Sequence, residues 1–71
     1  MSRLPRVTGR QVEAAFRRLG SAPVRGGPRW RHQDGRMMVI HLHPTKPVPL
    51  GTLRSILSLG RVSVDEFREA L

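Results

Sequence analysis

Apolar residues recur at intervals of three and four near the start of the chain, which is the spacing that lines up one face of a helix. The predicted helix spans residues 8–20. It opens on a capping box, in which the Thr8 hydroxyl accepts a hydrogen bond from the third helical amide and Gln11 reaches back to the cap. Gly20 is the left-handed residue expected to end it. The stripe predicted to face the core is Val12, Ala15, Phe16 and Leu19.

The same pattern returns twice in the last third of the chain. Residues 49–60 have Leu and Ile at helical spacing, and Gly60 is the expected stop. Ser63 begins a second capping box with Glu66, which predicts a short final helix. We therefore expect a bent pair of helices, in other words a split C-terminal helix. The residues predicted to face the core are Leu50, Leu53, Ile56 and Leu57 in the first segment, and Val64, Phe67 and Leu71 in the second.

The middle of the chain alternates between apolar and polar residues as β-strands do. Strands are predicted at 22–25, 28–32 and 36–42, and the Asp-Gly pair between the last two is a hairpin signal. A two-residue loop would put two arginines of one strand on the same face as three large apolar residues of the next. That register would bury charge or expose a large apolar surface, and either is costly.

A three-residue loop at 33–35, with the glycine in a left-handed bulge, shifts the pairing by one residue and removes this conflict. Trp30 then pairs with Met38. Continuing the pairing residue by residue along the two strands places Gly27 opposite His41. The face predicted to line the core carries Trp30, Met38, Ile40 and Leu42, and the open face carries Arg29, Arg31, Met37, Val39 and His41.

These elements predict an α+β fold, α-β-β-β-α, in a single domain over residues 1–71. Its three-stranded antiparallel sheet has helices on one face and solvent on the other. The chain has no cysteine, so neither disulfides nor thiolate-bound zinc can supplement its small core. No leader pattern and no apolar run of the ~20 residues that span a bilayer are present. We expect a cytoplasmic protein without a membrane partner.

The formal net charge is +8, and all but one of the 13 cationic residues are arginine, the exception being Lys46. Such a field attracts polyanions, and the planar donor fork of arginine suits phosphate oxygens. Codon usage in a GC-rich genome or an acidic protein partner would produce the same composition. The charge therefore favours nucleic acid without deciding it.

Four runs of the sequence, SRLPRVTGRQVEAAFRRLG, RHQDGR, HPTKPVPLGTLRSIL and SVDEF, are similar in order and spacing to the HicA family of toxins. The resemblance covers nearly the whole chain, and GTLRSIL is its most specific part. It implies a fold like the double-stranded-RNA-binding domain. It also implies a type II toxin, an endoribonuclease of mRNA that needs no metal or other cofactor and is neutralised by a HicB antitoxin.

The family holds one catalytic histidine in a Gly-Ser-His segment, five residues before the histidine of the turn. A lone imidazole suffices, because the RNA 2′-hydroxyl is an internal nucleophile. In this chain that position is Gly27, and a slip of one residue gives Pro28, which cannot transfer a proton either. His41, across the predicted strand pair, is our candidate substitute. The alternative is that His41 is an ordinary exposed strand residue.

Arg29 and Arg31 on the open face, with Lys46 in the proline-rich connection, are the expected RNA phosphate contacts. Arg54 in GTLRSIL either joins them or caps a helix. The alternative for each is a solvated polar surface.

Trp30 can stack a base but is predicted to lie in the core. His32 is expected to bond the turn backbone, and His43 to orient the loop that follows it. His41 and His43 have no carboxylate or cysteine nearby in sequence, so a metal site is not expected.

Three functions remain open from the sequence. The first is a HicA-like toxin that cleaves mRNA or another single-stranded RNA. The second is a catalytically degenerate relative, natural or inactivated for production, that only binds RNA or the antitoxin. The third is a small ribosomal or architectural RNA binder, which GTLRSIL does not favour.

Overall fold

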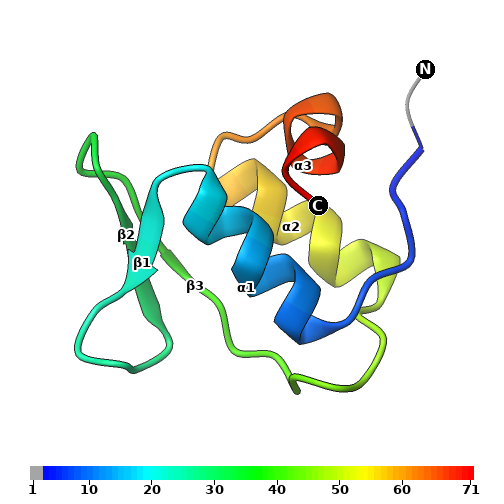
Figure 1. Ribbon diagram of the computed structural model, residues 1–71, viewed down its shortest axis with the longest axis horizontal. Helices are drawn as coiled ribbons and strands as arrows, with labels where there is room; N and C mark the ends of the chain where they lie inside the picture. Colours follow the sequence, from blue (N-terminus) through cyan, green and yellow to red (C-terminus); the bar gives the residue numbers. More distant parts are fainter. Residues whose placement is uncertain (1–2) are drawn as a thin grey trace.

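The computed structural model describes residues 3–71 and has three helices packed on one side of a small sheet (Figure 1). The sheet is antiparallel with strand order β1-β2-β3, which confirms the predicted α+β architecture and the split last helix. The elements follow in the order α1 (Gly9–Arg18), β1 (Ser21–Pro23), β2 (Arg29–His32), β3 (Met37–Val39), α2 (Leu50–Leu59) and α3 (Val64–Ala70).

Both predicted capping boxes are formed. The Thr8 hydroxyl accepts from the Gln11 amide at 3.4 Å, and the Gln11 side chain accepts from the Thr8 amide at 2.8 Å. At α3 the Ser63 hydroxyl and the Glu66 side chain make the same reciprocal pair, each at 3.1 Å. Gly20 follows α1 with φ +98°, the left-handed conformation expected of it. Local sequence therefore sets these three helix ends.

The β2–β3 hairpin adopts the three-residue loop. Trp30 pairs with Met38, and the His32 amide donates to the Arg36 carbonyl at 2.8 Å across the loop end. Gly35 has φ +97°, as the bulge position requires. This register buries Trp30, which is 2% exposed, and leaves alternate residues of both strands in solvent.

The third strand is shorter than predicted, because it ends at Val39 rather than Leu42. One more ladder bond follows it, from the Ile40 amide to the Pro28 carbonyl at 2.8 Å. Pro28 has no N–H to return, and the Gly27 amide turns back to the Val24 carbonyl at 3.1 Å. Regular pairing stops there because neither Pro28 nor Gly27 has an N–H available to bond the strand opposite.

The hairpin loop is tied to the helices by two side chains. His32 Nε2 lies 2.7 Å from the Leu19 carbonyl, at the end of α1. Arg36 donates to the Gly60 carbonyl at 2.5 Å and the Arg61 carbonyl at 3.2 Å, just after α2. These contacts fix the loop of the hairpin against two helix ends.

The core lies between the sheet and the helices, and two leucines predicted for it are outside. Leu50 and Leu71 are each 44% exposed. Leu50 is the first residue of α2, before the helix turns onto the sheet, and Val48 from the preceding loop is buried instead. Leu71 follows the end of α3, where Ala70 takes the inward position. The buried apolar residues are Val7, Val12, Ala15, Phe16, Trp30, Met38, Ile40, Val48, Leu53, Ile56, Leu57, Phe67 and Ala70.

Gly60 directly follows α2, as predicted, but it is not in the left-handed conformation. Its φ is −80°, and the left-handed residue is the next one, Arg61, with φ 54°. A Cβ on Gly60 would lie 3.0 Å from the Phe16 ring and 3.1 Å from the Met38 sulfur. The glycine is needed for close packing of α2 against the core, not for its backbone conformation.

Candidate catalytic and RNA-binding site

Gly27 and His41 meet at the end of the sheet where the ladder stops. They line one shallow pocket of about 360 Å³, whose other walls come from α1 and from covered residues such as Trp30 and Ile40, and neither Arg29 nor Arg31 lines it. His41 is exposed and Gly27 is half-buried. The other lining residues are Glu13, Arg17, Pro23, Gly26, Pro28, Trp30, Ile40 and Leu42.

Nothing in the backbone requires a glycine at position 27. The residue is outside the left-handed region, and a Cβ there would meet only the Val24 carbonyl, at an ordinary 3.6 Å. Its neighbours differ, because Arg25 and Gly26 have φ values of 54° and 70°. A side chain at position 27 would therefore fit without strain.

Arg17 and Glu13 come to this pocket from α1, and the sequence reasoning assigned them no role. They are four residues apart, so they lie one turn apart on the same helix face. The Arg17 guanidinium lies 5.2 Å from the centre of the Trp30 ring, a cation–π contact. The helical spacing of apolar residues in α1 showed only that Arg17 faces away from the core. It could not show the contact with Trp30, because Trp30 lies in another element.

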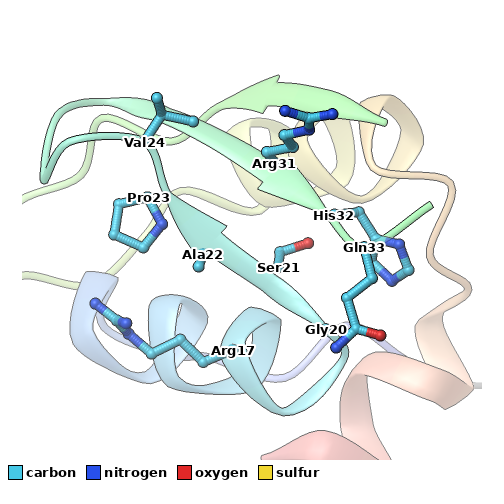
Figure 2. A pocket seen from close by; sticks show the side chains of 9 residues that line it. All are labelled: Arg17, Gly20, Ser21, Ala22, Pro23, Val24, Arg31, His32 and Gln33. Carbon is cyan, nitrogen blue, oxygen red and sulfur yellow. The ribbon is translucent and has the colours of Figure 1, made fainter. Parts of the chain in front are cut away.

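Arg17 also borders a second hollow, a groove of about 670 Å³ along β1. Figure 2 shows β1 between the Arg17 side chain on α1 and the Arg31 side chain on β2. Arginine side chains therefore stand on both sides of the first strand.

Arg29 and Arg31 share the open face of β2, and the other two predicted contacts lie elsewhere. Both arginines are exposed and alternate with the buried Trp30. The Lys46 carbonyl accepts the Gly9 amide at 3.3 Å, which places Lys46 beside the start of α1. Arg54 is exposed on α2, which packs against the covered side of β3. The structure thus brings together two of the four cations.

A family model for the HicA toxin of bacterial toxin–antitoxin systems matches residues 9–60. The chain belongs to the HicA toxin family. No curated protein and no solved structure matches this HicA chain. The family makes it a toxin of a toxin–antitoxin system, and it agrees with the resemblance seen in the sequence. Within residues 3–71, none of the helices of this HicA protein is long and apolar enough to span a membrane.

The other two histidines of this HicA protein have contacts to the backbone, as predicted. His32 Nδ1 lies 3.1 Å from the Asp34 amide and 3.0 Å from Asp34 Oδ1, while Nε2 lies 2.7 Å from the Leu19 carbonyl. His43 Nδ1 accepts the Thr45 amide at 3.3 Å, inside the proline-rich connection. Among residues 3–71, no three His, Cys, Asp or Glu side chains are grouped so that they could hold a metal ion.

Asp34 has the most perturbed carboxyl group in this HicA protein. The Arg36 backbone amide donates to it at 3.0 Å, and with the Arg36 and His32 side chains this lowers the pKa of Asp34 from 3.8 to about 2. Arg36 Nε lies 2.7 Å from the other carboxylate oxygen, in an ion pair whose N–H is not aligned as a hydrogen bond. Asp34 thus stabilises the hairpin loop, away from the Gly27 pocket.

Proposed function

We propose that this HicA protein is an endoribonuclease toxin that cleaves mRNA, with His41 as the base, and that a HicB-type antitoxin neutralises it. Family membership supports the toxin role. The observation that supports the chemistry is the shared pocket, because His41 lines the same hollow as Gly27, where the family's histidine is expected. Arg17 lines this pocket too and brings a permanent cation to it.

The proposed reaction needs one proton acceptor and a cation. His41 removes the proton of a 2′-hydroxyl, and the 2′-oxygen attacks the adjacent phosphorus. The 5′-oxygen leaves with a proton returned by the imidazolium, which yields a 2′,3′-cyclic phosphate and a 5′-hydroxyl. In this proposal Arg17, which lines the same pocket, offsets the charge that develops on the phosphorane oxygens. Arg29 and Arg31 on the open face, with Lys46 and Arg54, hold the flanking phosphates in this proposal.

The test compares RNA cleavage by the wild type with cleavage by His41→Ala, using a long unstructured RNA and a gel assay. Loss of the general base is expected to slow cleavage by about 10²- to 10⁴-fold. His43→Ala is the matched control, because His43 bonds its own loop and not the pocket. Equal rates for wild type and His41→Ala would refute the assignment of His41.

A second candidate function follows from the departure at Gly27. The family's histidine is expected at Gly27, or at Pro28 with a slip of one residue, and neither residue can transfer a proton. In this alternative the protein is a catalytically degenerate relative that only binds RNA or the antitoxin. Expression without an antitoxin in a bacterium distinguishes the two, because an active toxin stops growth and a binding module does not.

A further inference from the structure

The outer edge of β3 presents backbone groups that the sheet does not use. The ladder to β2 runs through the even-numbered residues, from the Arg36 carbonyl to the Ile40 amide, each bonded at 2.8 Å. In an antiparallel pair the residues between them direct their N–H and C=O groups away from the partner strand. Met37 and Val39 therefore each offer one donor and one acceptor outward, and no helix, loop or side chain within residues 3–71 bonds to them.

The side chains at this edge are apolar and exposed. Met37 is 54% exposed and Val39 is 57% exposed, both on the open face of the sheet. Native edge strands are usually protected by a charge, a proline or a covering segment. The three residues of β3 include neither a charged residue nor a proline.

The opposite edge of the sheet, formed by β1, is better protected than the edge formed by β3. In β1 the outward positions are Ser21 and Pro23, since the Val24 amide bonds the Arg29 carbonyl at 2.7 Å and fixes the alternation. Pro23 has no N–H to offer, so β1 has one outward donor fewer than β3. The sheet therefore has one edge that suits strand addition.

We propose that the edge of β3 binds an extended, acidic segment of a partner protein by strand addition. In this mode the main-chain bonds supply affinity and alternate side chains supply specificity. The net charge of +8 opposes pairing with a second copy of this chain and favours an acidic partner. Acidic side chains of the segment lie on the open face beside Met37 and Val39 and extend toward Arg31 and Arg29, which pair with those two residues across the hairpin. The apolar side chains of the segment alternate with them and point to the other face.

Binding at this edge also has a consequence for the candidate site. His41 follows the end of β3 by two residues, so an added strand that continues past Val39 runs toward it. This occlusion of His41 rests on the proposed ribonuclease function. The binding itself does not, and it is measured without RNA cleavage.

The first test follows amide hydrogen exchange by NMR, with a short capped peptide that alternates Glu and Val as the probe. The Met37 and Val39 amides are expected to exchange at least about tenfold more slowly with the peptide, as an added hydrogen bond requires. A peptide of Lys and Val in the same pattern should give no protection. The absence of selective protection would overturn the proposal. So would equal protection by a poly(U) oligonucleotide, or protection that rises with protein concentration alone.

The second test changes one outward donor. Val39→Pro removes an N–H that the ladder does not use, whereas Val39→Ala shortens the side chain and keeps the N–H. The proline variant is expected to bind the Glu-Val peptide about tenfold more weakly than the alanine variant. Continued protection of the Met38 and Ile40 amides shows that the sheet is intact. Equal binding by the two folded variants would overturn the proposal, and if Val39→Pro does not fold, a peptide N-methylated at alternate residues replaces it.

Discussion

A side chain at position 27 has room, and this lets the lost histidine be restored. We predict that, in a His41→Ala background, adding Gly27→His raises RNA cleavage by about 10²-fold or more, since a positioned imidazole adds that much to a proton-transfer step. Position 27 lines the same pocket as His41. Gly27→Ala, which adds only a Cβ, should lack the increase. A Gly27→His variant that folds and remains no faster than Gly27→Ala would show that this pocket does not hold the scissile phosphate.

Ser21 is a buried polar residue whose hydroxyl has no hydrogen-bond partner. It is 3% exposed. Because an unpaired buried hydroxyl costs free energy, we predict that Ser21→Ala raises the free energy of unfolding by about 1 kcal/mol. Urea denaturation of the wild type and the variant measures this change in the free energy of unfolding. Ser55→Ala is the control, since that exposed hydroxyl bonds Gly51 within its own helix and its loss should change stability by less than about 0.5 kcal/mol. A less stable Ser21→Ala protein would contradict the prediction.

Individual residues of the hairpin could be assigned from sequence because burial in a strand depends on parity. Trp30 was assigned to the core and Arg29 and Arg31 to the open face, and the structure confirms this. The contact of Arg17 with Trp30 could not be assigned in the same way. It joins a helix to a strand, and its geometry depends on how α1 crosses the sheet, which no local pattern encodes.

Among the elements, the β2–β3 hairpin depends most on ionised groups. The pKa of Asp34 is lowered to about 2, so its carboxylate stabilises the fold above its unfolded pKa near 4, and this stabilisation is lost as pH falls through 2. We predict that the melting temperature of the wild type falls between pH 4 and pH 2, and that the fall is smaller in Asp34→Asn. The amide oxygen of asparagine can still accept from the Arg36 amide.

A second carboxyl group, that of Glu66, also loses its stabilising charge at low pH. Its contribution to the melting temperature must be separated from that of Asp34. The Ser63 backbone amide lowers the pKa of Glu66 at the start of α3. A double variant, Asp34→Asn with Glu66→Gln, should therefore show a still flatter melting curve against pH. If Asp34→Asn loses as much stability as the wild type over this range, the hairpin loop is not held by the Asp34 charge.

The helix ends were easier to predict than the strand ends. Capping boxes and Gly20 are local signals, because each bond joins residues at most a few positions apart. The end of β3 depended on Gly27 and Pro28, which directly precede the neighbouring strand β2 and whose missing or diverted N–H groups stop the ladder. The structure also showed that the β3 edge is uncovered, which depends on where all three helices pack and has no signal within the strand itself.

At the scale of the whole molecule, the field of a +8 protein attracts RNA, but the field alone does not show which cations touch phosphate. The salt dependence of RNA binding separates attraction by the overall field from direct contacts to phosphate, because each phosphate contact releases counterions. If Arg29 and Arg31 each bind a phosphate, the slope of log K against log salt should fall in magnitude by about 1.4 in the double alanine variant, from about 0.7 per contact on a single strand. Fluorescence anisotropy with a labelled poly(U) oligonucleotide measures this slope. The double variant Arg6→Ala with Arg10→Ala is the control for the same change in net charge, because both residues are exposed and neither lies in the sheet. A double variant with weaker binding but the wild-type slope would mean that RNA follows the general field and that its contacts lie elsewhere.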